Sequence, residues 1–201
     1  MGKLQHRRLC PEEYGDYFAW GETEPHYAEG HSQDSPCSDW RNGYNGYDWD
    51  NYKWGKDAKR LKKYVDNPAY GPVDNKTELD DEDDVAEKFL GGDWRMPTEA
   101  EWKELKDNCK WKWTKVNGVN GYKVTSKKKG YTNKSIFLPA AGCRYGAYFY
   151  NAGSYGGYWS RSLYTTDSDF ARYLVFGSGD VNTDYYYRFS GRSVRAVQRK
   201  K

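Results

Sequence analysis

The chain has 201 residues, and its 32 basic and 29 acidic residues are mixed along most of its length, which leaves a formal net charge of +3. This balance argues against nucleic acid and membrane surfaces as general partners. A disordered chain is also excluded, because aromatic side chains make up 18% of the residues and predict a folded domain with an aromatic core.

The N-terminal part of the chain is predicted to be a short tail followed by a loop-rich region. Residues 1–10 carry positive charge that no apolar run follows, so we find no signal peptide and interpret them as a recut, non-native tail. Residues 14–21 mix aromatic and small side chains, which predicts a short strand closed by glycine. Residues 22–80 are polar and rich in turn signals, which predicts a long insertion or lid within one domain. The aromatic stretch 44–54 fits either a platform that stacks on sugars or a set of anchors that pin the loop to the body.

A first helix is predicted after an acidic run. The run at residues 78–84 leads into residues 85–90 and then a glycine pair. Acidic side chains stabilise the N-terminus of a helix and glycine ends one. Calcium binding is the alternative role for these carboxylates, but the run lacks the ligand spacing of an EF-hand. We therefore expect helix capping and no metal site.

A second helix and a series of strands complete the expected domain, residues 11–198, before a basic tail at 199–201. Thr98 and Glu101 have the spacing of a capping box, and Trp102 and Leu105 lie on one helical face, so a helix is predicted from 98 to about 108. This order of elements predicts an α+β domain with antiparallel sheets. The expected strands are residues 111–113, 121–125, 135–138, 157–160, 171–176 and 193–197.

The cysteines do not identify a site. They stand at positions 10, 37, 109 and 143 and lack the CxxC and CxxH spacings of zinc and redox motifs. A disulfide between Cys109 and Cys143 and a pair of half-buried free thiols both remain open, so the redox compartment is not determined.

The C-terminal third has an unusual composition. Residues 135–197 contain no Lys, Glu, Gln or Met, although the other 138 residues hold 20 Lys and 11 Glu, and ten of the 20 Tyr lie between 145 and 189. An AAC or AAT codon rewritten at its adenines gives Tyr, Asn, Asp, Ser, Gly, Phe and other residues of this segment, but never those four. Tyr, Ser, Gly and Asn are also the residues that binding loops of antibodies favour. An ordinary Tyr-rich β-domain is the alternative interpretation.

Several ordered blocks resemble one protein family. The blocks are residues 11–22, 92–98 with Glu101 and Leu105, 136–142, 158–160 and 193–197. Together they resemble the Fibrobacter-type major paralogous domain, which looks like a branch of the C-type-lectin-like fold related to the formylglycine-generating enzymes. The resemblance implies an α+β fold of this type with two helices, short antiparallel strands and a long polar insertion. Two departures are a different segment before Pro11 and Arg161 where Ser is common.

The Tyr-rich segment extends this resemblance. Such a domain with a C-terminal third scattered with Tyr, Asn, Ser and Asp is similar to the variable proteins of diversity-generating retroelements, whose mutagenic copying rewrites codons of one exposed patch. The resemblance implies a non-enzymatic, cofactor-free protein whose diversified face recognises a macromolecule, protein or glycan, on a host or cell surface. It also implies a place on a phage tail tip or a bacterial surface.

The expected variable region is residues 145–190. Strand alternation puts Leu174 and Phe176 in the core and Tyr173 on the outward face. The aromatic run 185–187 breaks this alternation and is expected in a loop with outward side chains. Expected scaffold positions are Trp159, Leu174, Phe176, Gly191 and Val194. The expected ligand-binding positions are Tyr145, Ala147, Tyr148, Tyr150, Tyr155, Gly157, Tyr158, Tyr164, Asp167, Ser168, Asp169, Phe170, Tyr173, Val175, Gly177, Asp180, Asp184, Tyr185, Tyr186, Tyr187, Phe189 and Ser190.

Two other function classes were weighed against this one. An enzyme of the formylglycine-generating type resembles a copper or thiol catalyst with paired cysteines late in the domain, but no Cys follows Cys143 and the three His lie at positions 6, 26 and 31. A His-dependent site in the core is therefore excluded. A calcium-dependent lectin lacks its Glu-Pro-Asn, Gln-Pro-Asp and Trp-Asn-Asp motifs here. Calcium-independent sugar binding through Tyr and Trp stacking stays open.

Overall fold

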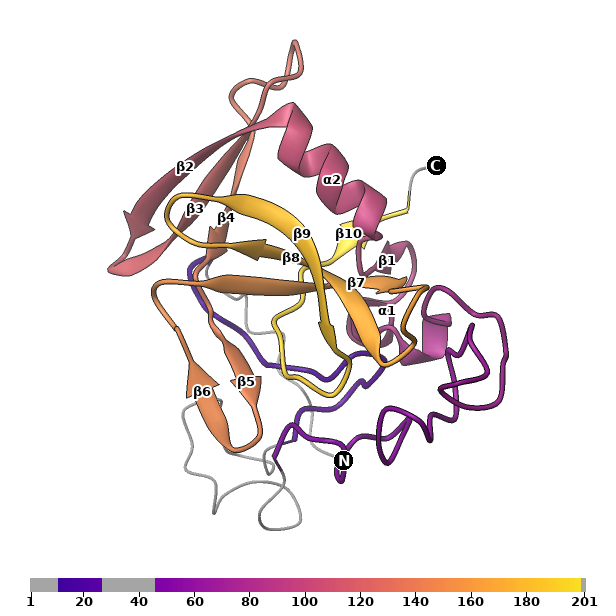
Figure 1. The fold of residues 1–201 in the computed structure, drawn as a ribbon. Helices are drawn as coiled ribbons and strands as arrows, with labels where there is room; N and C mark the ends of the chain where they lie inside the picture. The colour runs from indigo at the N-terminus through magenta and orange to yellow at the C-terminus, as the bar shows by residue number, and fades with distance from the viewer. Residues whose placement is uncertain (1–10, 27–45, 200–201) are drawn as a thin grey trace.

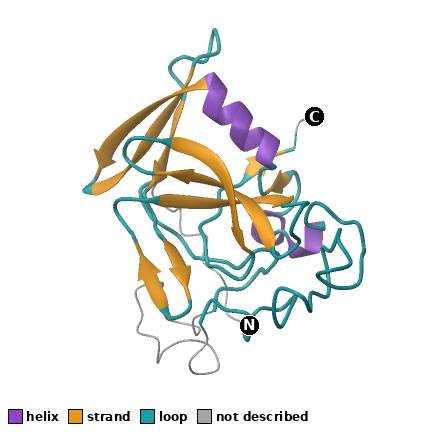
Figure 2. Ribbon diagram, in the orientation of Figure 1, coloured by secondary structure: helices purple, strands orange, loops and turns teal. Residues whose placement is uncertain are grey.

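The computed structural model describes residues 11–26 and 46–199, which form a mixed α+β fold. Within these residues there are two α-helices, one of them short, and four small sheets whose strands all pair antiparallel (Figures 1 and 2). The expected class, α+β with antiparallel sheets, is confirmed. No helix in this part of the chain is long and apolar enough to cross a membrane. The helices are α1 (Val85–Leu90) and α2 (Glu99–Asn108).

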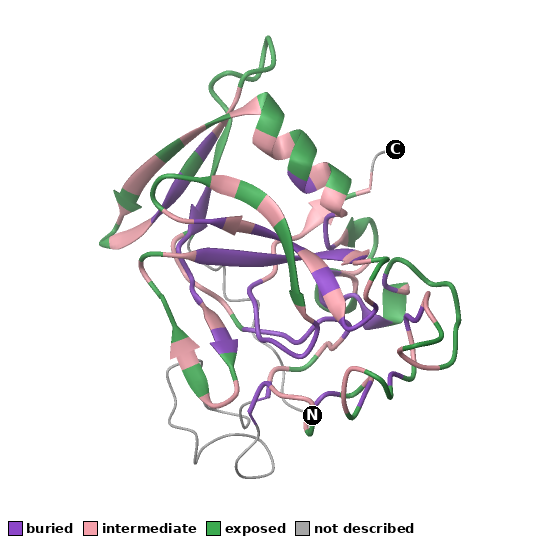
Figure 3. Ribbon diagram, viewed as in Figure 1, coloured by how far each residue is buried: buried purple, intermediate pink, exposed green. Residues whose placement is uncertain are grey.

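The central sheet is packed on both faces. Its strand order is β7-β8-β9, so β9 lies at its edge. On one face of β8, Leu174 packs in a cluster with Trp102 of α2, and on the other face Tyr173 packs with Trp159 and Trp20. Figure 3 shows how far burial extends along β7 and β8, while much of β9 is exposed. The strands are β7 (Gly156–Leu163), β8 (Phe170–Phe176) and β9 (Val181–Tyr187).

A second three-stranded sheet closes one of these clusters. A tight turn at Asn117 and Gly118, both with positive φ, joins its first two strands in the manner of a two-residue hairpin. Tyr122 then packs edge-on against Phe176 of the central sheet, with ring centroids 5.3 Å apart. The sheet is made of β2 (Cys109–Val116), β3 (Val119–Ser126) and β4 (Ser135–Pro139).

Both helices begin as their sequences predict. The Asp84 carboxylate accepts hydrogen bonds from the backbone N–H of Ala86 and Glu87 and so caps α1. Thr98 and Glu101 form the reciprocal capping box of α2. The capping role expected for the acidic run is therefore confirmed at Asp84.

Two expected strands are shorter in the structure. In residues 14–21, Phe18 forms an isolated antiparallel bridge to Arg192. The next backbone N–H on the same side, that of Trp20, donates to the Arg188 carbonyl, so the pairing does not extend into a strand. In residues 193–197, Ser193 makes one parallel bridge to Tyr158 before the chain turns away. The remaining strands are β1 (Trp94–Arg95) pairing with β10 (Val197–Gln198), and β5 (Cys143–Tyr145) pairing with β6 (Tyr148–Tyr150).

The described part of the polar insertion, residues 46–80, contains neither helix nor named strand but contributes to the core. The hydroxyl of buried Tyr47 donates to the Tyr17 carbonyl at 2.6 Å, and that of buried Tyr52 donates to the Trp20 carbonyl at 2.7 Å. These two aromatics therefore anchor the loop rather than form an open sugar platform. Tyr44 of the same stretch lies outside the described residues.

Cys109 and Cys143 are free thiols, each partly buried. Of the two open alternatives, the structure has the thiol pair. Cys10 and Cys37 lie outside the described residues.

Candidate binding surface

Five large tyrosines are exposed on the β5–β6 hairpin and on β9. Their exposed fractions run from 37% to 67%, far above those of the tyrosines in the core. All five belong to the expected variable set, and they come from two segments about 35 residues apart in sequence. They are Tyr145 (40%), Tyr148 (67%), Tyr150 (42%), Tyr185 (40%) and Tyr186 (37%).

Ring contacts join the two segments into one surface. The rings of Tyr145 on β5 and Tyr186 on β9 meet edge-to-face with centroids 6.3 Å apart. Tyr148 stands opposite Tyr145 in the hairpin register, and its ring lies 6.1 Å from that of Tyr150. Tyr185 precedes Tyr186 on β9, so its side chain points to the opposite side of the sheet. We call the other four exposed tyrosines, Tyr145, Tyr148, Tyr150 and Tyr186, the tyrosine face. The sequence-distant parts of the expected variable region are thus brought together at this place.

A separate, half-buried aromatic layer lies around Tyr185 on the opposite side of β9. Tyr185 stacks on Tyr164 with centroids 4.0 Å apart, and it also meets Phe170 edge-on at 5.4 Å. The guanidinium carbon of Arg172 lies 4.4 Å from the Tyr164 ring centroid, and Arg172 pairs with Glu99 of α2. The neighbouring phenol of Tyr164 raises the pKa of Tyr185. The layer holds Tyr185 in one orientation.

The expected ligand-binding positions differ widely in exposure. Exposed are Tyr145, Tyr148, Tyr150, Asp180, Asp184, Tyr185 and Tyr186. Half-buried are Ala147, Tyr155, Tyr164, Asp167, Phe170, Val175, Gly177 and Tyr187. Buried are Gly157, Tyr158, Ser168, Asp169, Tyr173, Phe189 and Ser190.

Two placements expected for these positions are wrong. Tyr173 does not face outward, because its ring packs on Trp159 at 5.8 Å and lies 3.8 Å from the guanidinium carbon of Arg192. The run 185–187 is not a loop but the end of β9. Consecutive aromatics are tolerated there because β9 is an edge strand, where neither face is fully covered.

Tyr158 and Phe189, two other buried members of the set, are packed into the core. The hydroxyl of Tyr158 donates to the Pro139 carbonyl at 2.6 Å, and its ring stacks on Phe176 at 5.9 Å. Phe189 packs against Trp49 of the insertion with centroids 4.9 Å apart. These side chains cannot contact a ligand without unfolding their surroundings.

Buried arginines behind the tyrosines are the feature that sequence reasoning missed. Arg188 is fully buried and donates to the carbonyls of Tyr64, Ser168 and Lys63 and to the Tyr52 hydroxyl. It thereby ties the insertion to the end of β9. One signal was present in the sequence: in a segment without Lys, the remaining cations are all Arg, whose planar fork suits buried hydrogen bonding.

The acidic run contains a group of carboxylates that already hold a cation from the chain. Ligand atoms of Asp80, Glu82 and Asp83 lie within 4.8 Å of one another. The ammonium of Lys63 lies 2.6 Å from Asp80, 3.6 Å from Glu82 and 2.7 Å from Asp83. Lys63 therefore occupies the position in which a metal ion would have to bind, and its ion pairs raise its pKa against the opposing effect of burial.

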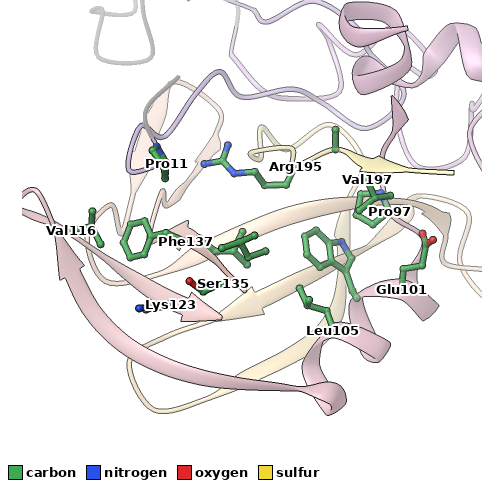
Figure 4. Close-up of a pocket in the computed structure, with 14 residues that line it drawn as sticks. Pro11, Pro97, Glu101, Leu105, Val116, Lys123, Ser135, Phe137, Arg195 and Val197 are labelled. Atoms are coloured by element: carbon green, nitrogen blue, oxygen red, sulfur yellow. The ribbon is translucent and has the colours of Figure 1, made fainter. Parts of the chain in front are cut away.

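An apolar groove of about 730 Å³ lies elsewhere on the domain, between α2, the β2–β3–β4 sheet and the segment before β10 (Figure 4). Its walls include Trp102, Leu105, Ile136 and Phe137, and Arg195 lies on its rim. None of the expected ligand-binding positions lines it.

The cysteines and the histidine among the described residues are partly or fully buried. Burial raises the pKa of both Cys109 and Cys143, which favours the unreactive thiol over the thiolate. His26 is buried and stacks on Tyr47, with its Nε2 2.8 Å from Glu22. The other two His lie outside the described residues.

Comparison of the chain with protein-family models, with curated proteins and with solved structures finds no match.

Proposed function

We propose that this protein is a non-enzymatic binding protein that uses the tyrosine face to recognise a macromolecule on a host or cell surface. The observation that carries this proposal is the tyrosine face itself: four exposed rings from two chain segments, within a segment whose composition matches rewritten adenine codons. Exposed large aromatics are otherwise scattered singly on soluble proteins.

The physical basis of recognition is the chemistry of tyrosine. Each exposed ring offers a large contact area at the cost of ordering only two side-chain torsions, and its hydroxyl donates and accepts hydrogen bonds. Tyr185 and Tyr186 are further restrained by their ring contacts with Tyr164 and Tyr145. Such preorganisation lowers the entropic cost of binding, and truncation of one central ring in such an interface costs about 2 kcal/mol or more.

The proposal extends to the family and the setting. In it, the domain has the C-type-lectin-like fold of the Fibrobacter-type major paralogous domain, and it is a variable protein of a diversity-generating retroelement. A phage tail tip or a bacterial surface is the proposed location. The two helices, the small antiparallel sheets and the long loop are compatible with this fold at the level of class.

The test is to sequence the DNA that flanks the gene. We expect a near-copy of the codons for residues 145–190, beside a gene for a reverse transcriptase, with mismatches confined to adenines of the copy. The mismatches should fall on codons of the tyrosine face and spare that of Arg188. The lack of such a copy at a fully sequenced locus would refute the diversified binder and leave a fixed Tyr-rich domain.

A second candidate is calcium-independent sugar binding by a fixed surface. Tyr148 and Tyr150 favour it, because both are exposed and their ring centroids are 6.1 Å apart on one strand of a hairpin. Aromatic faces stack on the apolar faces of sugars. On a glycan array, this function predicts weak binding that survives a chelator and is lost in a Tyr148→Ala/Tyr150→Ala variant.

A further inference from the structure

A buried guanidinium lies directly behind the tyrosine face. Arg192 is 2% exposed, and two backbone hydrogen bonds with Phe18, of 3.0 and 3.1 Å, fix its position in the chain. Its guanidinium carbon lies 3.8 Å from the ring centroid of Tyr173, 4.8 Å from that of Tyr186 and 5.1 Å from that of Trp159. Of these three rings, only that of Tyr186 reaches the surface. Tyr186 is therefore the ring of these three that lies between the guanidinium and the surface.

The guanidinium has unused hydrogen-bond donors. Its Nη1 donates to the Tyr155 hydroxyl at 2.9 Å. Its Nε is buried without a hydrogen-bond partner, and its Nη2 has no partner among the described residues. Nε–H and Nη2–H together form the edge of arginine that binds a carboxylate through two parallel hydrogen bonds. In Arg192 this edge is free.

Two other buried arginines near the central sheet are compensated in different ways. Arg188 directs its donors to carbonyl oxygens, and Arg161 lies 3.3 Å from Asp81 and 3.7 Å from Asp84. Within residues 11–26 and 46–199, no carboxylate lies within ion-pair distance of Arg192. A buried charge without a partner is costly, and the aromatic rings around Arg192 compensate it only in part.

We propose that Arg192 is an anion-binding group of the tyrosine face and that the residue at position 186 controls access to it. The ligand chemistry is a carboxylate, offered by an acidic group of the partner. With Tyr at 186, the ring covers the cation and the face presents an aromatic surface. With a small residue there, the space beside the guanidinium opens to a carboxylate. This inference rests on the proposed function, since it treats position 186 as one that varies.

The guanidinium of Arg192 fits beside residue 157 only because that residue is glycine. A Cβ added at Gly157 would lie 2.5 Å from Nη1 of Arg192, so the guanidinium fills the space that the missing side chain leaves. Gly157 therefore bounds the guanidinium on one side, and the ring of Tyr186, which also contacts Tyr145, bounds it on another. One codon thus selects between aromatic and acidic partners without any change in the scaffold.

The experiment titrates the full chain and three variants with acetate, the smallest carboxylate, at low ionic strength. Tyr186→Ser removes the cover, Tyr186→Phe keeps it, and Tyr185→Ser removes an equally exposed ring that does not lie over Arg192. The readout is the NMR signal of the Arg192 Nε–H, and circular dichroism checks the fold. We expect Tyr186→Ser to bind acetate at least tenfold more tightly than the other three proteins.

Equal acetate responses in all four proteins would overturn the proposal. So would an undiminished response in a folded Tyr186→Ser/Arg192→Lys variant, because the anion would then bind elsewhere. The comparison of Tyr186→Ser with Tyr186→Phe and Tyr185→Ser does not depend on changing Arg192 and stays decisive if that change impairs folding. A negative acetate result leaves the gene-locus test of the binding function untouched, and a negative locus result leaves the acetate result standing.

Discussion

Replacing three tyrosines of the C-terminal segment by serine should give three clearly different losses of stability. Tyr148 is 67% exposed, so Tyr148→Ser should change the free energy of unfolding by no more than about 0.5 kcal/mol. Tyr185→Ser removes two aromatic contacts, with Tyr164 and Phe170, at about 0.5–1.5 kcal/mol each, and should cost about 1–3 kcal/mol. Tyr173→Ser empties a core position and should cost about 3–5 kcal/mol.

Urea unfolding followed by circular dichroism measures the three losses, and an unchanged dependence of the free energy on urea confirms that the native and unfolded states are comparable. In a thermal scan, the change at Tyr173 should lower Tm by about 10 °C, since roughly 2–4 °C correspond to 1 kcal/mol in a domain of this size. The order of the three losses is the critical result. If Tyr148→Ser costs as much as Tyr173→Ser, the tyrosine face is part of the core and cannot be a binding surface.

Three further predictions follow from the ion pairs and the helix cap. Arg95 donates two hydrogen bonds to Glu101 and is the main cause that lowers the pKa of Glu101 to about 2. Glu101→Gln should therefore lower the free energy of unfolding by about 1–2 kcal/mol at pH 7, after allowance for solvent screening. Urea titrations should show this loss disappearing as pH falls from about 5 to about 2. Asp84→Ala should lower the free energy of unfolding by about 3 kcal/mol, because it leaves the N–H groups of α1 and of Met96 without acceptors, whereas a loss below 1 kcal/mol in urea would contradict this capping role. Calcium should raise the Tm of a Lys63→Ser variant but not that of the unaltered protein, and a rise in both would show that Lys63 does not occupy the carboxylate group.

The features that sequence reasoning predicted are those encoded locally. The acidic run before α1 and the capping box of α2 each lie within a few residues, and the structure contains both helices where they were expected. Alternation within one strand likewise placed Leu174 and Phe176 in the core. Such signals need no knowledge of distant contacts.

The errors concern burial set by partners far along the chain. Tyr173 is buried because Trp159 and Arg192 cover its face of β8, and nothing near residue 173 in the sequence specifies that cover. The run 185–187 fits a strand only because β9 has a free edge, which depends on the order of strands in the sheet. The sequence predicted one exposed patch but not the contact between Tyr145 and Tyr186. That contact joins residues of two different sheets, whose relative placement depends on distant parts of the chain.

The continuous burial of β7 has a consequence for how such a gene can evolve. Residues 156–161 are all buried and separate the two parts of the expected variable region that hold its exposed positions, 145–155 and 164–187. A copying process directed at adenines distinguishes codons, not burial. Some buried residues can be encoded without adenine, and such codons are not rewritten by this process. These residues are Gly157, Ser168, Arg188 and Phe189.

Three other buried residues cannot be encoded without adenine, because every codon for tyrosine or aspartate has adenine at its second base. They are Tyr158, Asp169 and Tyr173. Each is buried, and rewriting any of them would remove a core side chain. If the gene is diversified as proposed, the mutational load of the population should concentrate at these three codons. The proportion of folded proteins among the progeny would then be set by three buried residues rather than by the many exposed positions around them.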